Sequence, residues 1–494
     1  MARPLSVLFL SSEVEPYAKT GGLADVSCSL PQTIKHFDHE IRIMMPCYGS
    51  INHRAAKLHE MTKLKDVQIH VGDRIYPASV KSSILTNSSS KLQIYFIGNP
   101  DLFSRPGLYV DPATQQDYHD NDERFIFFCH GVLETLKVMG WQPDIIHCND
   151  WQTGLVPAYL KTTYRDDPFY KDTRTVFTIH NMAYQGVFPS STFPKTSLPM
   201  EMFSESGVIA HGNLNLMKSG LMFAYALTTV SERYAQEIQC SAEFGYGLQG
   251  VVSMRKKDLV GIVNCIDYSV WNPAVDEFIP HRYDSKSLDA KLENKKALLE
   301  SVGLPFNEST PLIGIISRLA DQKGFDLIGA ILDQMMKLDL QLVILGTGER
   351  RYHDMLERAR RAFPERIAIH LAFNNELAHL IEAASDMFLM PSRYEPCGLN
   401  QLYSLKYGTV PIVRATGGLD DTIEQVNPAT GTGTGFKFTR YDSAELLSTI
   451  QGALQLFKDR AFWKKIIKNG MSKDFSWELS AKKYIQLYRS VLQT

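Results

Sequence analysis

Short apolar runs recur along the chain, and longer segments in which apolar residues follow helical spacing separate them. A short continuous apolar run fits a strand buried on both faces, as in a parallel sheet covered by helices. Such runs occur at residues 7–10, 41–45, 94–97, 144–148, 176–179, 227–230, 312–316, 341–345, 387–390 and 410–413. Their alternation with helical segments predicts the α/β class, built on parallel sheets.

The strand pattern lapses into polar sequence between Trp271 and Pro311, and a new strand–loop–helix series begins at Leu312. A chain of 494 residues is too long for one core, so this lapse is the expected domain boundary. We predict an N-terminal Rossmann-like domain over residues 1–270 and a C-terminal Rossmann-like domain over residues 271–476. Residues 477–494 predict an amphipathic terminal helix, and periodicity leaves open whether it packs back on the N-terminal domain.

Composition bears on partners and location rather than on the fold. A net charge of -2 gives no reason to expect nucleic acid or an anionic membrane as a partner. The seven cysteines are scattered without a CxxC pair, which argues against a disulfide framework and fits reduced cytosolic thiols. The first apolar run turns polar too soon for a signal peptide, and no run reaches membrane length. We therefore expect a cytoplasmic protein.

The segment from Met390 to Asn400 carries an acid between a predicted strand and a predicted helix. Glu395 lies in the turn, and Gly398 frees backbone amides at the start of the helix. A helix start favours a ligand with negative charge, because unpaired N–H groups and the helix dipole converge there. An ordinary loop with a solvated Glu395 fits this segment equally well when it is taken alone.

Two other loops have the character of phosphate sites. Lys19 precedes Gly21 and Gly22 after the first predicted strand, without the spacing of a dinucleotide fingerprint or a P-loop. Arg318 and Lys323 lie on the loop that opens the second domain, where two cations suit a diphosphate leaving group without a metal. Each loop alone could be structural, but two of them in two domains favour function.

Further polar residues follow predicted strands and fit hydroxyl-rich ligands better than metals. Asp150 and His180 come directly after two strands of the first half, and no HxxxH or HxH pair supports zinc. Asp120 and Asp122 have the DxD form of a metal–diphosphate site, but they precede a predicted helix, whose start explains acidic residues equally directly. We favour the helix start and predict neither a metal nor a cofactor.

Together these segments resemble the bacterial glycogen synthase and plant starch synthase family. The motifs that carry the resemblance are KTGGLAD at 19–25, TIHNMAYQG at 178–186, SRLADQKG at 317–324, EPCGL at 395–399 and ATGGLDDT at 415–422. The resemblance implies the GT-B architecture, in which two Rossmann-like domains face each other across a cleft. It also implies retaining transfer of glucose from ADP-glucose to the non-reducing 4-hydroxyl of an α-1,4-glucan, without a required metal.

The resemblance assigns a role to each matching residue. Lys19 would lie at the diphosphate and sugar, Arg318 and Lys323 would hold the phosphates, and Glu395 would bind glucose hydroxyls. His180 would lie near the anomeric carbon, and Asp150 on the acceptor side. The further residues expected to bind substrate are Gly21, Gly22, Asp25, Asn181, Asn264, Gly346, Thr347, Tyr394, Cys397, Gly398 and Leu399.

Some positions depart from the family pattern. Cys265 replaces a glycine, Asn400 replaces a threonine, and Cys148-Asn149 replaces small residues or histidine.

Two other functions remain open: a catalytically silent glucan-binding protein with the same fold, and a retaining transferase that acts on a small-molecule acceptor. Loss of a principal charged residue would favour the catalytically silent protein. A panel of acceptor substrates tests for the small-molecule transferase.

Overall fold

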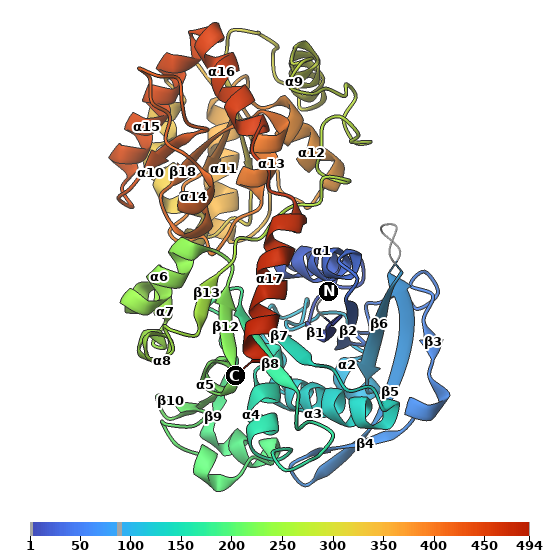
Figure 1. Cartoon of the computed structure of the whole chain (residues 1–494). Helices are drawn as coiled ribbons and strands as arrows, with labels where there is room; N and C mark the ends of the chain where they lie inside the picture. Colours follow the sequence, from blue (N-terminus) through green and yellow to red (C-terminus); the bar gives the residue numbers. More distant parts are fainter. Residues whose placement is uncertain (1–2, 86–90, 494) are drawn as a thin grey trace. The chain divides into compact units, whose positions relative to one another are not determined.

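The computed structural model describes residues 3–85 and 91–493, and the chain forms two compact units (Figure 1). Residues 1–230, 235–262 and 477–494 make the N-terminal unit. Residues 231–234 and 263–476 make the C-terminal unit. The N-terminal unit is therefore assembled from segments at both ends of the chain.

The N-terminal unit contains a ten-stranded sheet in the order β13-β12-β8-β7-β1-β2-β6-β5-β3, with β4 paired to β5. The strands from β13 to β6 are parallel, and β5 runs antiparallel to β6. The strand bounds are β1 Ser6–Leu10, β2 Glu40–Pro46, β3 His59–Glu60, β4 Val67–Val71, β5 Arg74–Leu85, β6 Leu92–Gly98, β7 Ile145–Asn149, β8 Arg174–Ile179, β12 Ala226–Thr229 and β13 Leu259–Gly261.

The antiparallel edge differs from the sequence prediction of purely parallel sheets. β5 alternates exposed and buried residues, as a strand with one solvated face does, so it has no continuous apolar run. The same holds for β4, whose burial also alternates. A search for continuous apolar runs finds the buried centre of a sheet and misses such an edge.

Helices cover both faces of this sheet, and a three-stranded sheet lies beside it. The helices are α1 Gly22–His36, α2 Pro100–Phe103, α3 Asn121–Met139, α4 Leu155–Lys161, α5 Leu216–Phe223, α6 Glu232–Cys240, α7 Ala242–Gly245, α8 Gln249–Met254 and α17 Trp477–Val491, and the short strands are β9 Val187–Pro189, β10 Ile209–Ala210 and β11 Asn213–Asn215. The last helix, α17, packs beside α1 (Figure 1). The Tyr488 hydroxyl lies 2.7 Å from Nδ1 of His147, which joins the end of the chain to β7.

The C-terminal unit contains a six-stranded parallel sheet in the order β16-β15-β14-β17-β18-β19. The strands are β14 Leu312–Ile316, β15 Gln341–Leu345, β16 Ile367–His370, β17 Met387–Met390, β18 Val410–Arg414 and β19 Phe436–Phe438. The helices are α9 Asp289–Ser301, α10 Phe325–Met335, α11 Arg350–Ala362, α12 Asn375–Ala384, α13 Asn400–Tyr407, α14 Gly417–Thr422, α15 Ser443–Phe457 and α16 Arg460–Met471.

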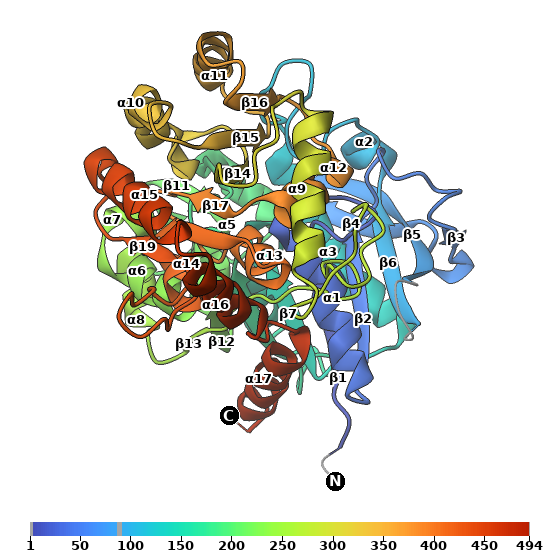
Figure 2. The same cartoon turned by 90° about the horizontal axis from the view of Figure 1, so that it is seen from above.

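Alternation along these strands builds two hydrophobic layers. Leu342 and Ile344 of β15 face a cluster that includes α10, α11 and α15, whereas Val343 and Leu345 face a cluster with α9 and α12. Figure 2 shows the sheet between these two sets of helices. Full burial of each such side chain contributes about 1.5–3 kcal/mol, so packing on both faces of the sheet stabilises the unit.

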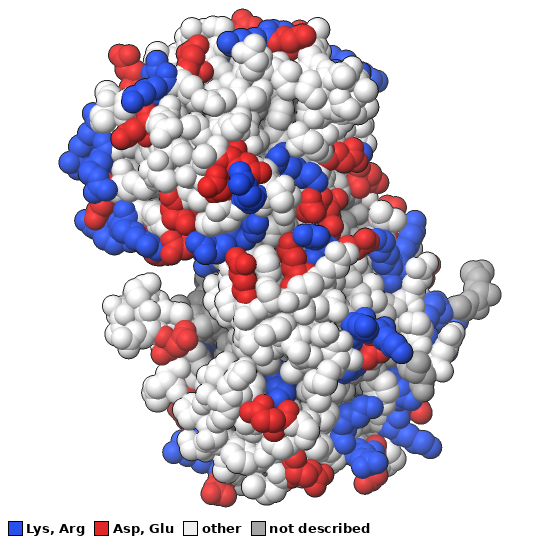
Figure 3. All heavy atoms as spheres, turned by 90° about the vertical axis from the view of Figure 1, so that its left-hand side faces the viewer, with Lys and Arg blue, Asp and Glu red and all other residues white. Residues whose placement is uncertain are grey.

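Charged side chains of both signs are interspersed on the face in Figure 3, and basic ones gather along one edge of the C-terminal unit. Carboxylates neutralise much of the positive charge of the arginine-rich helix α11. Arg350 pairs with Asp354, Arg351 with Asp321, and Arg360 with Glu357. Three of the five arginines of α11 thus have a carboxylate partner.

Candidate active site

In the N-terminal unit, the predicted polar residues lie at the carboxyl ends of adjacent strands. The loop with Lys19, Gly21 and Gly22 follows β1, Asp150 follows β7, and His180 follows β8. These strands are neighbours in the order β8-β7-β1 and are parallel. Their carboxyl ends therefore share one edge of the sheet, which is the edge where open α/β sheets bind ligands.

The loop after β1 is held by Glu13, a buried acid that the sequence reasoning missed. Its carboxylate accepts hydrogen bonds from the amide and the hydroxyl of Thr20, at 2.5 and 2.6 Å. Lys19 Nζ lies 2.7 Å from Asp25 Oδ1; burial alone would lower the pKa of Lys19, but this pairing outweighs it and raises that pKa. The sequence signal for Glu13 was an acid placed three positions after a buried strand.

Asp150 has a backbone conformation that is rare outside glycine. Its φ of 56° and ψ of -179° cost roughly 1–3 kcal/mol for a residue with a side chain. The carboxylate is turned inward, where Oδ1 accepts a hydrogen bond of 2.7 Å from the His180 amide. Burial raises the pKa of Asp150 to about 7. The strained backbone thus places this acid against the loop that carries His180.

The ring of His180 is fixed by Asn149. Asn149 Nδ2 donates to the Leu10 carbonyl at 2.8 Å, so its Oδ1 is left as an acceptor, 2.9 Å from Nε2 of His180. His180 therefore carries its proton on Nε2 and keeps Nδ1 as an acceptor. Burial lowers the pKa of His180 to about 3, so the ring is neutral at ordinary pH. Next to it, the side chain of Asn181 closes its own turn by accepting from the Ala183 amide at 3.0 Å.

In the C-terminal unit, three predicted segments also share an edge. Arg318 and Lys323 follow β14, Gly346 and Thr347 follow β15, and Glu395 follows β17. The strands are parallel neighbours in the order β15-β14-β17. The two basic residues thus lie on the loop after the middle strand, between the glycine turn and the acidic turn.

Glu395 and Lys323 form a direct ion pair, with Lys323 Nζ 2.6 Å from Glu395 Oε2. The Ser392 hydroxyl donates to the same oxygen at 2.9 Å, and Glu395 is 5% exposed. Arg318 lies nearer the surface and donates to the side-chain oxygen of Gln322 at 3.2 Å. The sequence reasoning gave Lys323 to phosphate and Glu395 to sugar, and it did not foresee that these two residues touch.

The loop around Glu395 is braced by the ATGGLDDT segment. A Cβ on Gly417, which has a φ of 44°, would lie 2.0 Å from the Glu395 carbonyl oxygen, so only glycine allows this approach. The Gly418 amide donates to that carbonyl at 3.1 Å. On another side, the Cys397 thiol lies 3.9 Å from the Asn264 carbonyl, and burial raises the pKa of the thiol. From there Gly398 and Leu399 lead into α13.

The glycine turn after β15 packs on the strand that precedes Arg318. A Cβ on Gly346 would lie 1.8 Å from the carbonyl oxygen of Ser317. The Leu319 amide donates to the Thr347 carbonyl at 3.0 Å. Tyr394 is buried, and its carbonyl faces the Gln322 side chain at 3.5 Å. These contacts fix the backbone on both sides of the basic loop.

The described residues contain no cluster of three or more His, Cys, Asp or Glu side chains that could hold a metal. Asp120 stands at the N-cap of α3, but its carboxylate pairs with Arg105 instead of capping the helix. Asp122, in the first turn, pairs with Lys195 at 2.8 Å and accepts from Thr192. Both acids of the DxD segment are therefore engaged by protein cations.

Two parallel α/β units, each with polar loops on the carboxyl edge of its sheet, define a glycosyltransferase of the GT-B type. The model of the starch synthase catalytic domain matches residues 6–254, and that of group 1 glycosyl transferases matches residues 299–471. The chain belongs to the glycogen synthase and starch synthase family of glucosyltransferases, as the sequence motifs indicated.

Individual relatives cover the whole chain. The glycogen synthase of Koribacter versatilis is 45% identical over 490 residues, which is 99% of each chain. That of Desulforudis audaxviator is 44% identical over 502 residues, covering 99% of this chain and 97% of the other. The catalytic domain of starch synthase IV from Arabidopsis thaliana, solved with ADP and acarbose bound, is 31% identical, with a TM-score of 0.91 and full coverage of both chains. In the described part of this chain, no helix has the length and apolar character needed to cross a membrane.

Proposed function

We propose that this enzyme elongates α-1,4-glucan chains by retaining transfer of glucose from ADP-glucose, with release of ADP in the cytoplasm. The observation that carries the proposal is the placement of Arg318, Lys323 and Glu395 on adjacent strand ends of one sheet. The full-length similarity to glycogen synthases supports it, as does the likeness to a starch synthase solved with ADP and acarbose. No metal or cofactor enters the proposal.

The ion pair in the C-terminal unit suggests how leaving group and sugar are aligned. An ammonium group has three donors, and Lys323 uses one of them on Glu395. The other donors can bind the diphosphate, while the second oxygen of Glu395 accepts from glucose hydroxyls. Arg318 adds a second cation for the negative charge that grows on departing ADP. Lys323 thus bridges the two halves of the donor substrate.

The residues of the N-terminal unit take the sugar and the acceptor in this proposal. Lys19 and the amides at Gly21 and Gly22 serve the diphosphate and sugar, and Asp25 serves the nucleoside. His180 presents a neutral ring near the anomeric carbon. Asp150 serves the acceptor side and orders the His180 loop through the amide that it binds. The remaining substrate contacts fall to Asn181, Asn264, Gly346, Thr347, Tyr394, Cys397, Gly398 and Leu399.

The test is incubation of the purified enzyme with labelled ADP-glucose and glycogen, with UDP-glucose in a parallel reaction. We expect label in linear chains that β-amylase, which cleaves α-1,4 bonds from non-reducing ends, releases completely. Absence of elongation with both donors would refute the proposal and favour a silent glucan-binding protein. Transfer to a small-molecule acceptor, but not to glycogen, would favour a small-molecule transferase.

A further inference from the structure

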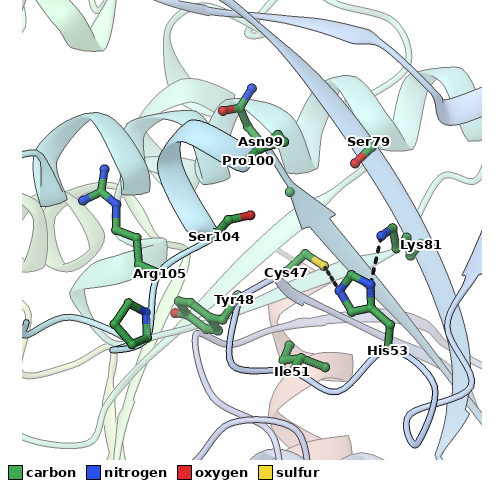
Figure 4. A pocket seen from close by; sticks show the side chains of 13 residues that line it. Cys47, Tyr48, Ile51, His53, Ser79, Lys81, Asn99, Pro100, Ser104 and Arg105 are labelled. Carbon is green, nitrogen blue, oxygen red and sulfur yellow. Dashed lines mark hydrogen bonds between the residues drawn. The ribbon is translucent and has the colours of Figure 1, made fainter. Parts of the chain in front are cut away.

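A hollow lies in the N-terminal unit, and none of the residues that the proposed transfer reaction uses lines it. It has a volume of about 530 Å³ and lies between the loop after β2, strand β5 and the turn after α2 (Figure 4). The loop supplies Cys47 and His53, the strand supplies Ser79 and Lys81, and the turn supplies Ser104. No part of the proposed transfer reaction uses these side chains.

The hollow is lined by basic side chains and by no acidic one among the described residues. Lys81 has no carboxylate within 4.0 Å in the described part of the chain, although Glu60 of β3 is its cross-strand neighbour. Arg105 also lines the hollow, but Asp120 neutralises it, and Figure 4 shows its guanidinium turned away from His53. Lys81 is therefore the cation left for a ligand.

His53 lies beside this lysine. Lys81 Nζ lies 3.3 Å from Nδ1 of His53 and, as an ammonium group, can only donate, so Nδ1 is the acceptor. The ring proton is then on Nε2, which faces the Cys47 sulfur at 3.9 Å. Burial, with Lys81 adding to it, lowers the pKa of His53. An anion that drew Lys81 away would let this ring take up a proton and become a second cation.

The remaining polar groups suit an anion with several oxygen atoms. The hydroxyls of Ser79 and Ser104 make no hydrogen bond to any described residue, and Figure 4 shows both on the side of the hollow. We propose that this hollow binds inorganic phosphate or a phosphate monoester, held by Lys81, His53 and the two hydroxyls. Carboxylates, which would repel an anion, are absent from the described lining.

The experiment is an NMR titration of the whole enzyme, saturated with ADP so that phosphate cannot occupy the donor site. The probe is inorganic phosphate, the signal is the ring Cε1–H of His53, and the His53→Gln variant assigns it. We expect saturable shifts and a higher pKa of His53 with phosphate bound. A His53 signal that phosphate leaves unchanged would overturn the proposal.

Variants distinguish phosphate binding in the hollow from nonspecific attraction to positive surface charge. Lys81→Gln should weaken phosphate binding about tenfold, because it removes a charge-assisted contact, and Lys81→Arg should retain it. Lys65→Gln, the same change on an exposed lysine outside the hollow, should leave binding unaltered. Equal loss in Lys81→Gln and Lys65→Gln, or displacement of phosphate by maltose, would refute an anion site. Binding is read without turnover, so failure here is distinct from failure of the proposed transferase activity.

Discussion

Replacing Lys323 by alanine should slow turnover far more than it weakens glucan binding. The ammonium lies 2.6 Å from Glu395 with 20% of its side chain exposed, so it acts from a largely dry position. In the proposed reaction it faces a leaving group whose negative charge grows in the transition state. Loss of one such donor costs about 3 kcal/mol, or on the order of a hundredfold or more in kcat.

The same substitution leaves Glu395 buried with Ser392 as its remaining side-chain partner. A buried charge that loses its partner costs about 1–3 kcal/mol, so Lys323→Ala should also lower the melting temperature. Glu395→Gln removes that charge, and the double variant should therefore recover part of the lost stability. Recovery of stability without recovery of turnover would separate the structural role of the pair from the catalytic role of the lysine.

The assay compares kcat and KM for ADP-glucose with the dissociation constant for a maltooligosaccharide measured by calorimetry. Lys337→Ala, at an exposed position just after α10, serves as a control for loss of a lysine on the same unit. The reasoning is refuted if Lys323→Ala reduces glucan affinity and kcat by the same factor, because the lysine would then act in binding alone.

The remaining predictions concern the N-terminal unit and motion. The His180 pKa is about 3 in the folded enzyme and near 6.5 in the unfolded chain, so its contribution to stability is lost as pH falls from about 6.5 towards 3. Between pH 7 and pH 5, the free energy of unfolding in urea should fall by about 2 kcal/mol more in the wild type than in His180→Gln. Equal decreases would contradict the buried neutral ring. Asn149→Asp places a carboxylate 2.9 Å from that ring and should move the acid limb of kcat/KM to higher pH; an unmoved limb would argue against the assigned tautomer. Asp150→Gly should be more stable than Asp150→Ala by about 1–2 kcal/mol in thermal unfolding, because only glycine adopts this backbone without strain; the reverse order would mean that the strain is not present. Finally, ADP with a maltooligosaccharide should reduce the radius of gyration in solution scattering if the substrates draw both units together; an unchanged curve would count against closure.

The fold class followed from the sequence because buried parallel strands leave short apolar runs. That signal predicted the α/β class, which the structure confirms, and it found the central strands of each sheet. It missed β4 and β5, since a strand with one solvated face alternates and never forms such a run. Which domain carries the terminal helix was also beyond periodicity, because apolar spacing shows that α17 has a buried face without showing what covers it.

The sequence predicted where the candidate residues lie along the two sheets, but not which of them touch. Strand ends identified Asp150, His180 and Glu395, because chain order alone places such residues on the carboxyl edge of a sheet. The pairing of Glu395 with Lys323 was not visible, since it joins two loops that are 72 positions apart. The unusual backbone of Asp150 has no sequence signature either, because nothing in the residue type announces a positive φ.

The partition of the N-terminal unit between the two ends of the chain has a consequence for synthesis. The helix that packs beside α1, and the Tyr488 hydroxyl that meets His147, come from a segment that is translated after the C-terminal unit. More than two hundred residues separate them from the preceding part of their own unit. At about 5–20 residues per second, the ribosome needs roughly 10–40 s to cover that distance. Through that interval α1 lacks its covering helix, so the N-terminal unit is completed only after the C-terminal unit has been made.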